Sequence, residues 1–208
     1  IKKLAYSLIN SGAIRIQISP KDPVAKNIEH FVAYVELDDK RFFLERIINE
    51  HPESKIMVFV RTKVRAERVF KALERMEIKS LTLHGDKDQK DRLAALNDFK
   101  SGKTKVLIAT DISARGIDIT GVDYVINYDL PEQAENYVHR VGRTGRGTLK
   151  GHAVSFCSPE EKPILDEIET YLDKPIDVLQ ISKAEYDSMI DFTNDNSGNL
   201  QVLLREIE

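Results

Sequence analysis

The sequence predicts an α/β fold, with a doubly wound, mainly parallel sheet and helices on both faces. Short apolar runs such as Ile56–Val60 and Val106–Ala109 are hydrophobic at every position, which is typical of strands buried on two faces. Between these runs lie stretches with helical periodicity, of which residues 63–76 are one. Strands that alternate with helices at this spacing predict βα units and a parallel sheet.

The alternation of strand and helix patterns can be followed along the chain. The expected strands are residues 27–37, 56–60, 78–83, 106–109, 124–126 and 153–157. The expected helices are residues 38–50, 63–76, 88–99, 131–141 and 159–172. We expect Asp38 and Asp39 to cap the first helix, and Pro131 with Glu132 to open the fourth. The helix at 63–76 is expected to turn Val64 toward the core. In such sheets ligands bind beyond the carboxyl ends of the strands.

Composition limits the class of protein. A chain of 208 residues with 41% hydrophobic residues suits one large domain, or one domain with appendages. The single cysteine, Cys157, cannot form an internal disulfide, and no Cys/His cluster has the spacing of a zinc site. No apolar run reaches the roughly 18 residues of a membrane span. We therefore expect a cytoplasmic protein that has no structural metal and does not contact a membrane.

The net charge of −3 conceals an asymmetry. Residues 159–208 hold 4 Lys/Arg against 13 Asp/Glu, which leaves a net charge of +6 on residues 1–158. The segment Arg61–Arg75 alone has six basic residues and two acids. A local basic patch favours nucleic acid as a partner, although a solvated helix face explains this segment nearly as well. On the second interpretation Arg65 is simply a solvated charge.

The stretch Tyr137–Gly147 contains the densest candidate site. Its arginines, Arg140, Arg143 and Arg146, are spaced three apart, and no acid interrupts residues 139–150. Glycines in the same stretch let the backbone leave a helix and approach a ligand closely. A guanidinium matches phosphate oxygens with a planar fork of donors, so this cluster suits a polyphosphate.

No complete phosphate-binding loop accompanies these arginines. Ser101–Thr104 has only the last letters of a Walker A loop, and a strand is expected after it where a helix is needed, so we interpret Gly102 as a helix end. Asp166–Glu169 imitates an acidic metal-binding box, but its spacing places it on a solvated helix face. Arginines for a phosphate without a loop that holds it imply that another domain brings the nucleotide.

With these motifs the chain resembles the second RecA-like domain of a DEAD-box ATP-dependent RNA helicase. Four segments are similar to the family's motifs and follow in the family's order: Ile56–Thr62 for motif IV, Gln89–Arg92 for QxxR, Ala109–Asp118 for motif V and His139–Arg146 for motif VI. The resemblance covers residues 25–175. It makes residues 1–18 the end of a first RecA-like domain, 19–24 an interdomain linker and 176–208 an acidic C-terminal extension.

The resemblance implies roles on the nucleotide side. Arg143 and Arg146 match the arginine fingers that reach the γ-phosphate, and Asp118 matches a residue that binds the ribose. His139, Arg140 and Arg115 match positions that contact the first domain; in isolation, Asp118 could be a turn cap and Arg115 a surface charge. The implied cofactors are ATP and Mg²⁺, both held mainly by the missing first domain.

For RNA, the resemblance implies contacts to the sugar–phosphate backbone that are independent of sequence. Arg92 and Thr110 match backbone-contacting positions, and Gly85, Arg61 and Thr62 are weaker candidates. Thr62 also stands where it can cap the 63–76 helix, and the two roles are compatible. The expected partners are RNA and the first domain in the same polypeptide, and the isolated domain is expected to be a monomer.

Two other functions remain open at this point. One is a DNA-directed superfamily 2 helicase domain, although His139 at the start of motif VI resembles the DEAD-box pattern better. The other is a noncatalytic RNA-binding module, whose affinity for RNA would not change when a first domain and ATP are added.

Because this chain lacks a Walker A loop and an acidic box, we expect residues 1–208 alone to bind ATP weakly and to hydrolyse it negligibly. Phosphate release by purified protein, with and without RNA, measures this. Turnover that survives removal of contaminating ATPases would contradict the prediction.

Overall fold

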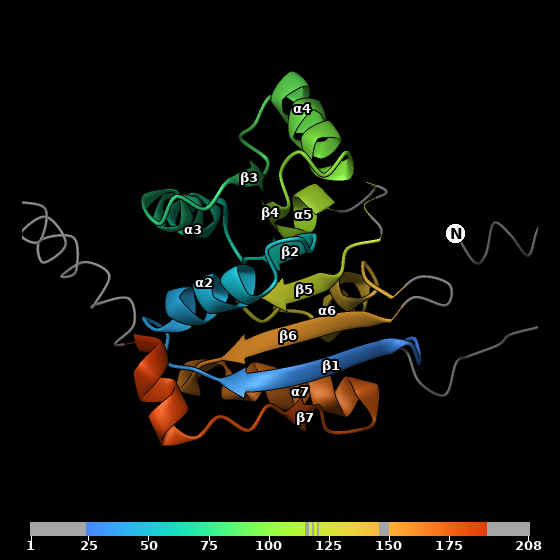
Figure 1. The fold of residues 1–208 in the computed structure, drawn as a ribbon. Helices are drawn as coiled ribbons and strands as arrows, with labels where there is room; N and C mark the ends of the chain where they lie inside the picture. Colours follow the sequence, from blue (N-terminus) through green and yellow to red (C-terminus); the bar gives the residue numbers. More distant parts are fainter. Residues whose placement is uncertain (1–23, 115–116, 118, 120, 146–149, 191–208) are drawn as a thin grey trace, which may run out of the picture.

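The computed structural model describes residues 24–114, 117, 119, 121–145 and 150–190. Its centre is one parallel sheet whose strands lie in the order β3-β4-β2-β5-β6-β1-β7 (Figure 1). The strands are β1 (Ile28–Tyr34), β2 (Ile56–Phe59), β3 (Ser80–Leu83), β4 (Val106–Ala109), β5 (Tyr124–Asn127), β6 (Gly151–Cys157) and β7 (Asp177–Val178). The expected fold class is confirmed. The expected segment 1–18 and all but Val24 of the expected linker lie outside the described residues.

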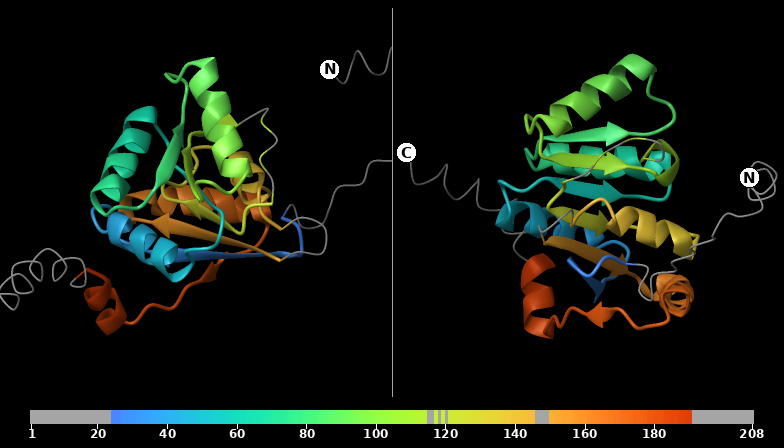
Figure 2. Two further views of the ribbon diagram at one scale, coloured as in Figure 1. Left: turned by 45° about the horizontal axis from the view of Figure 1, so that its top comes forward. Right: turned by 90° about the vertical axis from the view of Figure 1, so that its right-hand side faces the viewer.

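Helices cover both faces of the sheet (Figure 2). They are α2 (Lys40–Glu50), α3 (Lys63–Arg75), α4 (Gln89–Lys100), the short α5 (Asp111–Ala114), α6 (Ala134–Val141) and α7 (Lys162–Leu172), which a 3₁₀ turn at Pro159–Glu161 precedes. Within the described residues, no helix is long and apolar enough to cross a membrane.

Two layers of core form because successive side chains of a strand point to opposite faces. In β2, Met57 and Phe59 belong to the layer under α4, α6 and α7, whereas Ile56 and Val58 belong to the layer under α2 and α3. All four side chains are at most 1% exposed. This alternation explains why the strand is apolar at every position.

Several helix ends form as the sequence predicts. Thr62 caps α3, with its side chain accepting a hydrogen bond from the Arg65 amide at 3.1 Å. Asp88 caps α4 in the same way, accepting from the Asp91 amide at 2.7 Å. Gly102 follows α4 with φ +77°, a left-handed conformation that suits a glycine at a helix end. The Walker A lookalike is therefore a helix terminus.

One expected helix start is wrong, and one expected cap lies in the right position but lacks its hydrogen bond. Helix α6 begins at Ala134, and Pro131 lies before it in the buried connection from β5. Asp39 does hold the cap position of α2, but its side chain makes no cap hydrogen bond. It accepts a hydrogen bond from the Tyr186 hydroxyl at 2.9 Å, so a distant tyrosine has replaced the local amide as its partner.

The expected inward position of Val64 is also wrong. Val64 is 55% exposed, while Ala66, Val69 and Leu73 are buried. The core-facing stripe of α3 thus starts two residues later than the periodicity suggested, because Val64 lies in the first turn, at the rim of the sheet.

The sheet continues past residue 175. Strand β7 pairs with β1, and a helical segment at residues 183–190 follows it. The ring of Tyr186 packs on Phe43 with centroids 5.0 Å apart, and its hydroxyl accepts a hydrogen bond from the Glu36 amide at 3.0 Å. The start of the acidic extension is thus attached to the sheet and to α2.

Candidate functional site

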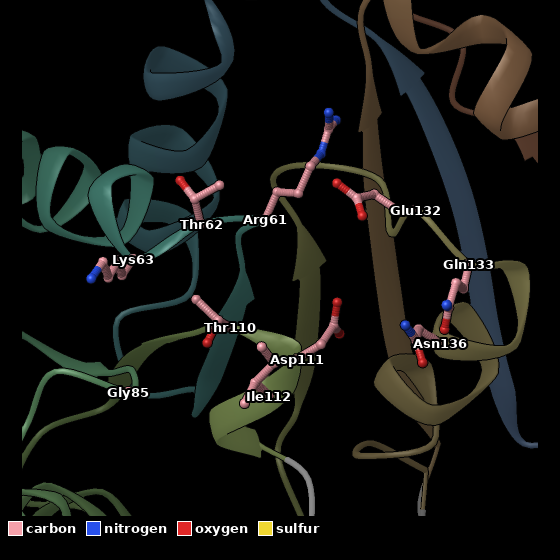
Figure 3. A pocket seen from close by; sticks show the side chains of 10 residues that line it. All are labelled: Arg61, Thr62, Lys63, Gly85, Thr110, Asp111, Ile112, Glu132, Gln133 and Asn136. Carbon is pink, nitrogen blue, oxygen red and sulfur yellow. The ribbon is translucent and has the colours of Figure 1, made fainter.

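A cleft of about 450 Å³ opens at the carboxyl ends of β2, β3 and β4 (Figure 3). Its lining includes Arg61 and Thr62 after β2, Gly85 after β3 and Thr110 after β4. These are four of the five residues for which the resemblance implied RNA contact. The parallel sheet brings them together because the ends of parallel strands share one edge.

Hydrogen bonds hold the floor of the cleft. Thr110 is 7% exposed, and its amide donates to Ser113 Oγ at 3.2 Å. The Ser113 hydroxyl in turn lies 2.5 Å from the Leu83 carbonyl, to which it donates. The end of β4 is thereby tied to the end of β3, and the Thr110 loop has a fixed position beside Gly85.

Arg61 lines the cleft, but its charge is paired inside the domain. Its Nη2 donates to Glu161 Oε1 at 2.8 Å, and Glu161 is only 4% exposed. The same carboxylate forms an ion pair with Lys40, which is fully buried, and accepts a hydrogen bond from the Leu130 amide. The Arg61 guanidinium therefore has a partner already, whereas its neighbour Lys63 pairs with Asp86, which is exposed.

Arg65 is not the solvated charge that the sequence suggested. Its Nε lies 3.5 Å from Asp129 Oδ1, and the Asp129 side chain is only 3% exposed. Asp129 also accepts a hydrogen bond from the Arg61 amide at 3.0 Å. A buried carboxylate needs such partners, so Arg65 belongs to the framework that supports the Arg61 loop.

Arg92 stands apart from the cleft, in the first turn of α4. Its Nε is buried and has no hydrogen-bond partner among the described residues. An unpaired buried donor is costly, so the Arg92 side chain would gain a hydrogen bond if it turned from this position toward a ligand oxygen.

A buried histidine lies next to Gly85, in the loop after β3. His84 is 5% exposed, and its Nε2 donates to Glu67 Oε1 at 2.7 Å. This hydrogen bond holds the pKa of Glu67 below its usual value, with help from Lys87. The pair joins α3 to the loop after β3, beside Gly85, which lines the cleft.

Arg140, on α6, is the most completely paired residue of the site. Its Nε and Nη2 donate to the two carboxylate oxygens of Asp111 at 2.7 and 2.8 Å. Its Nη1 donates to Asn127 Oδ1 at 3.1 Å and to the Asp129 carbonyl at 2.7 Å. The guanidinium also stacks on the Phe59 ring, 5.1 Å from the centroid.

This burial does not fit the interdomain role that the resemblance implied for Arg140. The residue is 1% exposed, and its donors are taken up by groups of its own domain. His139, its neighbour on α6, is exposed and remains a candidate for contact with another domain.

The loop after α6 presents Arg143 at the surface. This side chain is half-buried, and one of its nitrogens, Nη1, donates to the Ile117 carbonyl at 2.8 Å. Thr144 anchors the loop, since its Oγ1 donates to the Val122 carbonyl at 2.6 Å. Gly145 follows with φ +67°, and a Cβ there would come within 2.5 Å of Ile28 Cγ1. Only glycine fits that close approach.

Three expected site residues, Arg115, Asp118 and Arg146, lie outside the described residues. In the described part of the chain, no group of three or more His, Cys, Asp or Glu could hold a metal ion. The described part of the loop after α6 offers Arg143, a cationic donor that fits a phosphate.

Of the acids that organise the site, Asp111 lies within the segment that resembles motif V, whereas Asp129 and Glu161 were missed by the sequence reasoning. Asp129 stands two residues after β5, so its position at a strand end could have marked it. Glu161 ends a Ser-Pro-Glu-Glu capping box that starts at Ser158. That pattern predicts a helix start but not the burial of its carboxylate.

Comparison with known proteins agrees with this geometry. Residues 39–148 match the family described as "Helicase conserved C-terminal domain". The ATP-dependent RNA helicase RhlB of Shewanella frigidimarina is 39% identical over 191 residues, which are 92% of this chain and 43% of that protein. RhlB of Shewanella oneidensis is 38% identical over the same length. The chain thus spans less than half the length of these curated relatives.

Solved structures of DEAD-box proteins have the same fold. A structure of Saccharomyces cerevisiae Dbp5 bound to RNA and ADP BeF3 matches with a TM-score of 0.77 and 28% identity, over 93% of this chain and 51% of that one. Escherichia coli SrmB, described as a DEAD-box protein bound to regulator of ribonuclease activity A, matches with a TM-score of 0.69 and 32% identity. That match covers 76% of this chain and 92% of the SrmB chain.

We predict that Arg140→Lys destabilises the domain by about 3 kcal/mol, because lysine cannot replace the fork that spans Asp111, Asn127 and the Asp129 carbonyl. Urea denaturation followed by circular dichroism measures the change. Arg143→Lys is the matched control and should cost under about 1 kcal/mol, since that side chain is half-buried. Equal stability of the two variants would show that the Arg140 network is not structural.

Proposed function

This chain belongs to the family of helicase conserved C-terminal domains and has the RecA-like fold of DEAD-box proteins, and we therefore propose that it serves as the second RecA-like domain of an ATP-dependent RNA helicase. In this proposal the domain binds the RNA backbone and supplies arginine fingers and a ribose contact to ATP. The nucleotide and its Mg²⁺ are held mainly by a first domain.

The observation that carries the RNA half of the proposal is the cleft at the ends of β2, β3 and β4. It combines the hydroxyls of Thr62 and Thr110 with the Lys63 ammonium and the open backbone at Gly85. A Cβ at Gly85 would meet nothing within 4 Å, so the backbone there is accessible. Hydroxyls, cations and accessible amides suit phosphates and 2′-hydroxyls, which bind without reading sequence.

The ATP half of the proposal rests on Arg143 and on the family's motif order. Arg143 keeps donors beyond the Nη1 that is bonded to Ile117, so it is free to meet a phosphate. Arg146 completes the pair of fingers and Asp118 the ribose contact, with His139 and Arg115 facing the first domain. ATP supplies the phosphoryl group whose transfer to water drives the cycle. These arginines stabilise the charge that develops on it.

Arg140 acts indirectly in this proposal. It joins Asp111, on the RNA side of the site, to α6, which carries the finger loop. A rigid, buried connection of this kind would fix the position of the RNA cleft relative to the arginine fingers. RNA and ATP would then bind to one conformation of the domain.

We also propose that the isolated chain is a monomer and acts in the cytoplasm. The single cysteine, Cys157, is buried, and burial raises the pKa of its thiol to about 11. An unreactive, unpaired thiol suits a reducing compartment.

We predict that Arg92→Ala weakens binding of the two-domain protein to RNAs of different sequence by similar factors. Because one phosphate would then lack its cation, the salt dependence should become flatter. The magnitude of the slope of log K against log salt should decrease by roughly 0.7–0.9. Fluorescence anisotropy at several salt concentrations measures both quantities. Lys100→Ala, at the other end of α4, is the control and should leave the slope unchanged. A weakening confined to one RNA sequence would indicate base readout and would count against backbone binding.

For the fingers, we predict that Arg146→Lys in the two-domain protein lowers kcat of RNA-stimulated ATP hydrolysis by roughly 10³-fold or more, or at least about 4 kcal/mol, with KM nearly unchanged. Lysine keeps the charge but lacks the fork of donors. Steady-state phosphate release gives both parameters. Arg46→Lys, an exposed exchange on α2, is the control, because Arg65 pairs with a buried acid and cannot serve. A near-normal kcat for Arg146→Lys would refute the finger assignment.

A further inference from the structure

A second basic surface lies outside the cleft, in the groove between α2 and α3. This groove has a volume of about 510 Å³. Its charged lining consists of Arg41, Arg65, Arg68, Lys71 and Arg75, with Asp38 as the one acid among the lining residues. We call it the basic groove. It accounts for most of the cationic segment 61–75 that the cleft leaves unexplained.

Three of these cations are free to bind a ligand. Arg68, Lys71 and Arg75 are exposed, and their side chains form no ion pair with any residue that the structure describes. Arg65 differs, since it is paired with the buried Asp129. A solvated helix face would be expected to alternate charges and form i,i+4 pairs, as Arg46 and Glu50 do on α2. The groove side of α3 instead gathers one sign of charge.

One helix connects the basic groove with the cleft. Thr62 and Lys63, at the start of α3, line the cleft (Figure 3), and residues from Arg65 to Arg75 of the same helix line the groove. At 1.5 Å per residue, the distance along the helix from Thr62 to Arg75 is about 20 Å. One helix therefore carries cations from the cleft down the flank of the domain.

The chemistry of the groove favours a phosphate chain over a protein partner. Four of its five cations are arginines, whose forks match phosphate oxygens. The centre of a protein interface is depleted in charge and holds aromatic or apolar anchors. The aromatic ring that lines this groove, Tyr128, is 5% exposed and thus offers little of its surface. A free phosphate ion would use only a fraction of an elongated basic surface.

We propose that the basic groove is a second binding site for RNA, which holds the sugar–phosphate backbone of a strand that continues beyond the cleft. This rests on the proposed function of the cleft. The groove adds affinity for long single strands without sequence preference, because its donors are cationic side chains on a helix flank.

The test compares two oligouridylates, one of about 6 nucleotides that fills the cleft and one of about 20 that reaches past it. Binding to residues 1–208 is measured by fluorescence anisotropy over a range of salt concentrations. The variant Arg68→Gln/Lys71→Gln/Arg75→Gln should bind the long RNA at least tenfold more weakly, with a slope smaller by roughly 0.7 for each phosphate that the groove no longer neutralises. Its affinity for the short RNA should change less than about twofold, beyond a small long-range effect of charge.

The matched control is Lys26→Gln/Lys79→Gln/Lys100→Gln. These exposed lysines lie near the amino ends of the strands, at the opposite edge of the sheet, and their removal changes the net charge by the same amount. The control should keep the wild-type affinity for both RNAs. Because all six residues are exposed, both variants should fold, and circular dichroism checks this.

Other outcomes would overturn the proposal. Equal weakening in the two triple variants would show a bulk charge effect and no groove site. Unchanged binding of the long RNA by the groove variant, with weaker binding to polyglutamate, would assign the groove to an acidic protein. If the unsubstituted chain bound neither RNA, the proposed function of the cleft would be refuted, and the groove proposal with it. If the chain bound the short RNA but showed no higher affinity for the long one, only the groove proposal would be refuted.

Discussion

The buried guanidinium of Arg140 is the interaction on which the arrangement of the site depends. A cation that is 1% exposed is tolerated only when its donors are paired, because the interior solvates charge poorly. Asp111 supplies the opposite charge, while Asn127 Oδ1 and the Asp129 carbonyl accept hydrogen bonds from Arg140 Nη1. These partners come from the ends of two strands and are fixed against α6. The cleft and the loop after α6 therefore form parts of one rigid edge.

Pairing with buried acids also decides which cations are available to a ligand. Glu161 takes up Lys40 and Arg61, and Asp129 takes up Arg65, so three positive charges near the sheet edge serve the domain itself. The cations farther along α3 have no such partners among the described residues, since no buried carboxylate reaches that flank. The basic groove therefore consists mainly of cations that no buried carboxylate of the described chain neutralises. Some of the basic residues in the sequence stabilise the domain, and others are available to a ligand.

Most of the fold was predictable because its signals are local. Every strand except β7 was expected from the sequence, and β2 and β4 came from continuous apolar runs, for which the two faces of β2 show the physical reason. β7, with only two residues and both exposed, carries no hydrophobic signal, and it is held in place by pairing with β1. The start of α6 was predicted three residues too early, and Val64 was predicted to be buried although it is exposed. At helix ends, contacts with the rest of the domain compete with periodicity.

The fold class, the order of the motifs and the residue types of the site can all be read from the amino-acid sequence alone. Those features follow from hydrophobic periodicity and from motif spacing, which are local patterns in the sequence. Which arginines are exposed to a ligand is settled by tertiary packing. Arg140 and Arg143 stand three residues apart in one motif, yet one is enclosed and the other half-exposed. The difference arises because Asp111, 29 residues away from Arg140 along the chain, meets only the first of them. Pairing between charges that are distant in sequence depends on how the strands assemble, and no local pattern records it.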